Sequence, residues 1–335
     1  MQMTQSRRDF LASASLAAAA GVLGTRGSLA DEGPPETTTV RIGKTTSICL
    51  APAYIADELL RAEGFTEIHY LAAAGGPSAA EMVARGEIDL HASFAGTLVY
   101  QLDKGLPLTA LAGVNVGCYE LFAHEPIQTI GDLKGRRVGI QTMASSAHLY
   151  LSIIARHIGL DPKSDIEWVT TPKGNAMELF AEGKTDAFLA FPPEPQALRA
   201  RKVGRMILST VADQPWSQYI CCTLFANRAW VHAHPVAAKR VVRALLKAAD
   251  LCAAEPENAA QRLVEGGFTK RYDYALQALQ EIPYRAWRDY DGEDSMRFYA
   301  LGLHEAGMIK SSPNALIAEG TDWRFLNELK RELKA

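Results

Sequence analysis

The sequence lacks the features that mark several large classes of protein. After the first thirty residues, no hydrophobic run reaches the about 18 apolar residues that a bilayer-spanning helix needs, so we expect the mature chain to be soluble. The formal net charge is only -3, which provides neither a basic surface for nucleic acid nor a polybasic patch for an anionic membrane. We therefore expect no nucleic-acid partner.

Motifs for catalysis and nucleotide binding are also missing. The chain contains no G-x-x-x-x-G-K-[ST], no G-x-G-x-x-G and no G-x-S-x-G. These absences argue against a P-loop NTPase, a dinucleotide-binding enzyme and a serine hydrolase with a nucleophile elbow. We expect no enzyme activity, no catalytic residue and no cofactor.

Cysteines are few and show no metal-binding pattern. None of the five stands in C-x-x-C spacing, so the sequence predicts neither a zinc site nor a thioredoxin-like site. We expect most of them to be small buried apolar side chains. Cys221 and Cys222 are adjacent, and in a regular strand they would point to opposite faces. The five are Cys49, Cys118, Cys221, Cys222 and Cys252.

The first thirty residues are typical of an export signal. Arg7-Arg8 precede an apolar run that ends near Leu23, and Ser28-Leu29-Ala30 supplies the small residues of a cleavage site. The paired arginines favour the twin-arginine pathway, with an ordinary Sec signal as the alternative. We expect cleavage after Ala30, a periplasmic location, and a flexible polar leader over residues 31–38.

An internal repeat organises the rest of the chain. Residues 86–94 read GEIDLHASF and residues 183–191 read GKTDAFLAF, so glycine, aspartate and phenylalanine coincide at an offset of 97. Each copy is predicted to run strand, helix, strand, helix, strand, which requires a parallel sheet with helices on both faces. The predicted strands are 39–43, 67–72 and 88–93 in the first copy, and 137–141, 166–169 and 187–191 in the second.

Two such copies predict two α/β lobes. We expect lobe one to be discontinuous, built from residues 39–122 and 223–335, and lobe two to span residues 123–222. Helices are predicted near 52–63, 78–85, 146–158 and 175–182, and the C-terminal part is predicted to be helical over 235–254, 256–266, 272–281 and 295–306.

The ligand site is predicted in the cleft between the lobes, because open parallel sheets bind ligands at the carboxyl ends of their strands. Ser145 and Ser146 begin a helix, where they either contact an anionic group or merely cap the helix. Glu194 is the one carboxylate in these loops, and it either faces a ligand amine or is a solvated loop charge. The candidate ligand-binding residues are Thr46, Ser47, Gly76, Pro77, Ser93, Phe94, Thr97, Thr142, Ser145, Ser146, Phe191, Glu194 and Tyr219.

Several of these segments resemble a known family. Residues 127–139 (IQTIGDLKGRRVG), the turn Ala144-Ser145-Ser146, the turn Gly75-Gly76-Pro77 and the motif Gly86–Asp89 are similar to the nitrate/sulfonate/taurine (SsuA-like, NMT1/THI5-like) substrate-binding proteins. The resemblance covers about residues 38–310. It implies the type II periplasmic-binding-protein fold and a ligand site that includes Gly76, Pro77, Ser145, Ser146, Phe191 and Glu194.

The resemblance also implies a role and partners. It predicts the extracytoplasmic solute-binding component of an ABC importer, a monomer that binds a sulfonate-, taurine-, nitrate- or pyrimidine-like molecule and delivers it to a permease and an ATPase in the inner membrane. The sequence departs from sulfonate-binding members, because Phe191-Pro192-Pro193-Glu194 replaces their aromatic-Asp-Pro motif. Two alternatives remain: a pyrimidine-precursor synthesis enzyme of the same fold, and a ligand-sensing lobe for a receptor.

Overall fold

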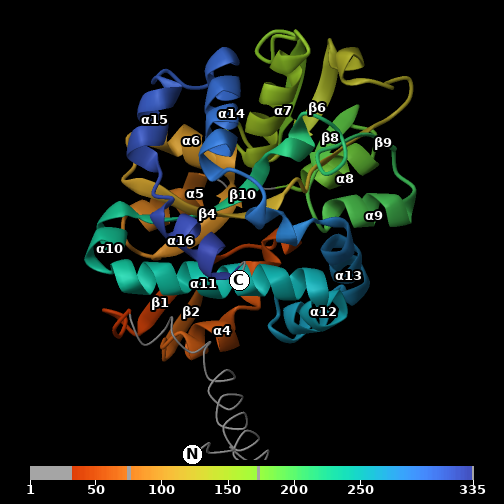
Figure 1. Cartoon of the computed structure of the whole chain (residues 1–335). Helices are drawn as coiled ribbons and strands as arrows, with labels where there is room; N and C mark the ends of the chain where they lie inside the picture. The colour runs from red at the N-terminus through yellow and green to blue at the C-terminus, as the bar shows by residue number, and fades with distance from the viewer. Residues whose placement is uncertain (1–31, 74–76, 172–173, 334–335) are drawn as a thin grey trace, which may run out of the picture.

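The computed structural model describes residues 32–73, 77–171 and 174–333, and it contains two mixed β-sheets of the same topology (Figure 1). In each sheet three parallel strands are followed by an antiparallel strand and then by an edge strand. The first sheet has the order β2 (Glu67–Ala72), β1 (Thr39–Lys44), β3 (Leu90–Phe94), β10 (Ile220–Asn227), β4 (Leu108–Val116). The second has the order β7 (Ile166–Thr170), β6 (Arg136–Ile140), β8 (Ala187–Ala190), β5 (Glu120–Ala123), β9 (Arg205–Ser209).

Matching ion pairs show why the repeated aspartates are present. Asp89 accepts a hydrogen bond from the backbone N–H of Arg41 at 2.8 Å and binds its guanidinium at 2.6 Å. Asp186 does the same with Arg137, at 2.8 Å for both contacts. Each aspartate therefore ties the start of one parallel strand to the neighbouring parallel strand of its sheet, so the sequence repeat corresponds to a structural repeat.

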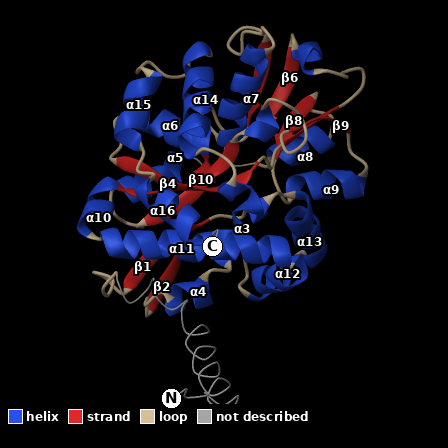
Figure 2. Cartoon of the chain, viewed as in Figure 1, coloured by secondary structure: helices blue, strands red, loops and turns tan. Residues whose placement is uncertain are grey.

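Helices cover both sheets (Figure 2). Their bounds in the first part of the chain are α3 (Ala51–Tyr54), α4 (Asp57–Ala62), α5 (Pro77–Ala84), α6 (Ala95–Asp103), α7 (Ser146–His157), α8 (Ala176–Ala181) and α9 (Glu194–Arg201). The C-terminal helices are α10 (Arg228–Ala233), α11 (Pro235–Ala254), α12 (Pro256–Glu265), α13 (Tyr272–Glu281), α14 (Gly292–Glu305), α15 (Pro313–Gly320) and α16 (Arg324–Leu333). No helix in the described part of the chain is long and apolar enough to cross a membrane.

Two predicted helices differ from the structure. The helix expected over 52–63 is broken into a 3-10 turn (Ile48–Leu50), α3 and α4. The helix expected from Ser295 begins at Gly292, because the Asp291 carboxylate accepts hydrogen bonds from the backbone N–H groups of Glu293 and Asp294.

The chain passes between the sheets twice. It leaves the first sheet after Val116 and joins the second at Glu120, then leaves the second at Ser209 and rejoins the first at Ile220. The two crossings bind one another through Thr210, whose hydroxyl accepts from the backbone N–H groups of Cys118 and Tyr119 at 3.2 and 2.9 Å. Strand membership places the crossings at residues 117–119 and 210–219, so the lobe boundaries proposed at 122 and 222 fall inside β5 and β10.

Residues 32–38 differ from the flexible leader that the sequence suggests. The Glu36 carboxylate accepts hydrogen bonds from the backbone N–H groups of Val236 and Ala237, at the start of α11. Glu32 forms ion pairs with Arg243 and Lys239. Charged partners on α11 thus hold this segment against the first lobe.

A buried ion pair anchors α11 to the end of α4. The Arg243 and Glu63 side chains are each 2% exposed and lie 2.8 Å apart. Glu63 also pairs with Lys247, and Arg243 also pairs with Glu32 and Glu332, so removing Glu63 leaves Arg243 with two of its three acidic partners. The loss is therefore smaller than the about 3–5 kcal/mol expected for a fully uncompensated buried charge.

We therefore predict that Glu63→Ala lowers the free energy of unfolding by about 2–3 kcal/mol, measured by urea denaturation. Glu58→Ala is the matched control, because Glu58 is 74% exposed and its ion pair with Arg262 is expected to contribute less than about 1 kcal/mol. Equal losses in the two variants would contradict the assignment of Arg243 as a buried charge that depends on Glu63.

Candidate ligand site at the junction of the two lobes

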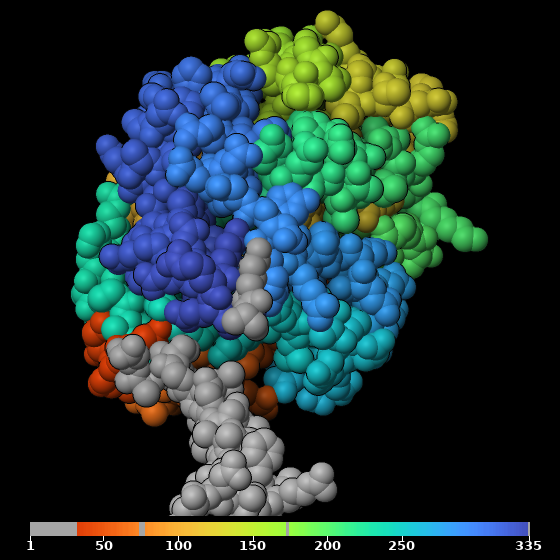
Figure 3. All heavy atoms as spheres, viewed as in Figure 1, coloured from red at the N-terminus to blue at the C-terminus, as the bar shows by residue number. Residues whose placement is uncertain are grey.

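The strand-end loops of the two sheets meet directly. The backbone N–H of Ile48, after β1, donates to the carbonyl of Pro192, after β8, at 3.1 Å. In the space-filling view the blue C-terminal segments of the first lobe lie against the green segments of the second (Figure 3). The structure is therefore a closed arrangement in which the loops after β1 and β8 meet.

Repeat-equivalent phenylalanines flank a tyrosine from the first crossing. Phe94 ends β3, and Phe191 follows β8 at the offset of 97 residues. The ring of Tyr119 makes edge contacts with both, with centroids 5.8 Å apart in each case. One ring from each lobe thus packs on the crossing that joins them.

The Phe94 ring is also the centre of a larger aromatic cluster. It stacks on Tyr150 of α7 with a centroid distance of 4.6 Å and contacts Tyr299 of α14 edge-on at 5.0 Å. Tyr150 therefore brings the second lobe against two aromatic rings of the first. Tyr119, Tyr150 and Tyr299 were not predicted as site residues, since single aromatic residues in a sequence cannot be told from core residues.

Three hydroxyl groups of predicted residues in this region are buried without a hydrogen-bonding partner. Leaving such a group unpaired costs about 1–3 kcal/mol, so each is a candidate contact for a bound solute. The three atoms are Ser93 Oγ, Thr97 Oγ1 and Ser145 Oγ. The phenols of Tyr150 and Tyr299, which contact Phe94, interact with one another.

Ser145 occupies the N-cap position of α7 but does not cap it. Its side chain makes no hydrogen bond to the helix, and its Oγ is one of the three unpaired atoms. The next hydroxyl, that of Ser146, lies close enough to Tyr119 to offset part of the rise in pKa that burial causes for that phenol. The helix start thus presents polar groups to the junction.

Glu194 is half-buried at the start of α9. Its Oε2 accepts a hydrogen bond from the backbone N–H of Phe191 at 3.1 Å, and it has no ion-pair partner among the residues that the structure describes. Burial raises the pKa of this carboxyl to about 8. Its surroundings thus differ from those of a solvated loop charge.

The remaining candidates lie in several places. Thr46 is exposed, and the Ser47 hydroxyl lies 3.0 Å from Cys49 Sγ. The Thr142 carbonyl accepts a hydrogen bond from Ser145 N–H at 3.1 Å. Tyr219 stacks on Phe298 at 3.8 Å and has no ring contact with the Phe94 cluster. Gly76 lies outside the described residues, and Pro77 is described only as the first residue of α5.

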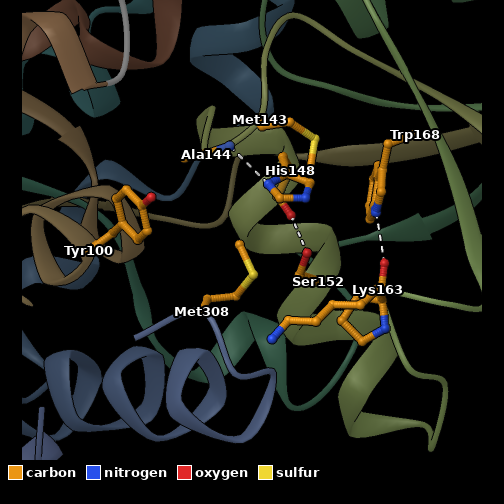
Figure 4. Close-up of a pocket in the computed structure, with 9 residues that line it drawn as sticks. Tyr100, Met143, Ala144, His148, Ser152, Lys163, Trp168 and Met308 are labelled. Carbon is orange, nitrogen blue, oxygen red and sulfur yellow. Dashed lines mark hydrogen bonds between the residues drawn. The ribbon is translucent and has the colours of Figure 1, made fainter. Parts of the chain in front are cut away.

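A surface pocket of about 290 Å³ lies beside the junction, between α6, α7 and the end of α14 (Figure 4). Tyr100 and Met308 face His148 and Ser152 across it. His148 Nδ1 accepts a hydrogen bond from Ala144 N–H at 3.0 Å, and burial lowers the pKa of this imidazole to about 4. The pocket contains none of the thirteen predicted residues, although Met143 and Ala144 of its wall belong to the same turn as Ser145.

Solved structures with this arrangement include solute receptors. The periplasmic nitrate-binding protein NrtA of Synechocystis PCC 6803 is 16% identical, with a TM-score of 0.75 over 90% of each chain. The alkanesulfonate-binding protein SsuA of Xanthomonas axonopodis pv. citri, solved with MOPS, is 20% identical, with a TM-score of 0.72 over 86% of this chain and 99% of that one. The desulfurization enzyme DSZB has a lower TM-score of 0.56, at 16% identity, over 88% of this chain and 99% of that one.

The fold is that of the periplasmic binding proteins, as the sequence predicts, and the predicted cleft loops meet between its lobes. The NMT1-like family matches residues 33–264, which is more than half of the chain. The chain belongs to the NMT1-like family, which confirms the resemblance seen in its motifs. No curated protein sequence matches it.

We predict that Glu194 makes stability fall as the pH rises. Its folded-state pKa of about 8 lies above its ordinary value of 4.5, so between these pH values the folded chain holds more protons than the unfolded chain. The unfolding free energy should therefore decrease from pH 5 to pH 8. In Glu194→Gln this decrease should be smaller by about 2 kcal/mol, which is less than the whole pKa shift would give because the Glu194 side chain is partly exposed.

Urea denaturation of both chains at several pH values between 5 and 8 measures this difference. An identical pH dependence in wild type and Glu194→Gln would show that the Glu194 carboxyl has an ordinary pKa.

Proposed function

We propose that this protein is the extracytoplasmic solute-binding component of an ABC importer. It captures a small organic molecule between its two lobes and presents the closed form to a permease and ATPase in the inner membrane. We place lobe one at residues 39–122 and 223–335 and lobe two at 123–222. By sheet membership, the whole of β5 is assigned to lobe two and the whole of β10 to lobe one. In this proposal the chain acts as a periplasmic monomer, exported with the signal over residues 1–30, which lie outside the described residues.

The unpaired hydroxyls at the junction carry this proposal. They come from β3 and α6 on one side and from the N-cap of α7 on the other, so a solute bound there contacts both lobes. A solute that satisfies donors on both lobes favours the closed form, because its binding energy is larger there than in an open form. The two short crossings joined at Thr210 are the hinge in this account.

The junction chemistry limits the class of solute. Aromatic rings and neutral hydroxyls offer an apolar body and hydrogen bonds, and Ser93, Thr97, Ser145, Tyr150 and Tyr299 belong to no charged cluster. This combination suits a sulfonate- or taurine-like zwitterion or a pyrimidine-like heterocycle better than nitrate, which lacks an apolar body.

A thermal-shift screen with the purified chain tests the proposal. The panel comprises taurine, alkanesulfonates, nitrate, bicarbonate, pyrimidines, amino acids and small aromatic acids. One compound should stabilise the fold by about 2.7 kcal/mol at a hundredfold excess over its dissociation constant. Ser145→Ala and Ser93→Ala should each lower the affinity for that compound about five- to tenfold, as expected for the loss of one hydrogen bond.

Ser164→Ala is the control, because Ser164 is exposed and hydrogen-bonds to Asp161 away from the junction. Unchanged affinity in both junction variants would place the binding site elsewhere. If no compound shifts the transition and native mass spectrometry finds nothing bound, the chain is not a receptor for these solute classes.

A further inference from the structure

Four of the five cysteines gather in the interior beside the candidate ligand site. The Sγ atoms of Cys49, Cys118 and Cys222 all lie within 4.8 Å of one another. Cys118 Sγ is also 3.8 Å from Cys221 Sγ and 3.9 Å from Cys222 Sγ. All four side chains are buried, and none forms a disulfide.

A β-bulge explains how adjacent cysteines both reach Cys118. In the pairing of β10 with β4, Ile220 lies opposite Val116 and Cys222 lies opposite Asn115, so Cys221 is an extra residue without a partner. A bulge breaks the alternation of side chains and redirects the extra residue. The alternation expected for a regular strand therefore does not apply at Cys221, and both sulfurs approach Cys118 Sγ, at 3.8 and 3.9 Å.

We propose that Cys49, Cys118 and Cys222 form a binding site for a thiolate-preferring metal ion of the Zn(II) or Cu(I) class. Soft sulfur ligands select these cations. Sulfurs at about 2.3 Å from a zinc ion stand about 3.8 Å apart, close to the 3.9 Å between Cys118 Sγ and Cys222 Sγ. The donors come from three separate segments, so the spacing rules for zinc motifs miss them.

Coordination would change the protonation of the cluster. The thiolate is the form of cysteine that binds a metal ion, so each of these buried thiols releases its proton when the cation binds.

The location gives the metal a structural role at the hinge. Cys49 lies in the turn whose Ile48 N–H binds the second lobe, Cys118 lies in the first crossing, and Cys222 lies in the returning strand. A cation bound to all three would link the turn that contains Cys49 to the first crossing and to β10, the strand that follows the second crossing. The site does not depend on the solute proposed above, and its test contains no solute.

The experiment loads the reduced full chain anaerobically with Zn(II) or with Cu(I) and measures the metal retained after gel filtration against a competing chelator. We expect about one equivalent per chain for at least one of the two cations. Cys118→Ser should weaken retention at least tenfold, because Cys118 contacts both Cys221 and Cys222. Cys252→Ser is the matched control, since Cys252 is buried on α11 outside the group of three.

X-ray absorption at the metal edge of the loaded wild-type chain keeps the test valid even if a variant fails to fold. A first shell of three or four sulfurs at about 2.3 Å supports the site. A nitrogen or oxygen shell, equal retention by wild type and Cys118→Ser, or no retained metal of either kind would overturn it and leave the four cysteines as packing residues.

Discussion

The position of β10 determines the geometry of the whole junction. This strand returns from the second lobe and inserts antiparallel between β3 and β4, with Ile220 to Ala226 all buried. Its pairing sets Cys222 opposite Phe94, the ring at the centre of the aromatic cluster. If β10 shifted by one residue, every side chain of the strand would exchange faces, and Phe94 and the cysteines would lose their present neighbours.

The two lobes use the same construction for the same purpose. An aspartate near the beginning of a strand is fixed to an arginine of the neighbouring strand, and a phenylalanine at or just beyond the strand's end faces the other lobe. Tyr119 lies between the two phenylalanines and belongs to the crossing itself. A solute that displaces or extends these ring contacts therefore acts on both lobes and on the connection between them, which is how binding can be coupled to closure.

Much of this architecture could be predicted from the sequence, because it rests on local periodicity and on the repeat. These patterns predict the parallel strands, the helix α11 and the equivalent positions of Phe94 and Phe191 in the two copies of the repeat. Register could not be predicted: the bulge at Cys221 is invisible in the sequence, and so is the meeting of cysteines separated by up to 173 positions. Tyr150 and Tyr299 lie on amphipathic helices, where their spacing is that of ordinary core residues.

The central claim is that the chain is a receptor whose lobes close on a solute. Small-angle X-ray scattering tests it most directly, on the chain stripped of solute by unfolding and refolding and on the same chain saturated with the compound that stabilises it. The account predicts a smaller radius of gyration and maximum dimension in the saturated sample, with the scattering curve of the closed structure in Figure 1. Identical curves for the stripped and saturated samples would contradict closure around the solute.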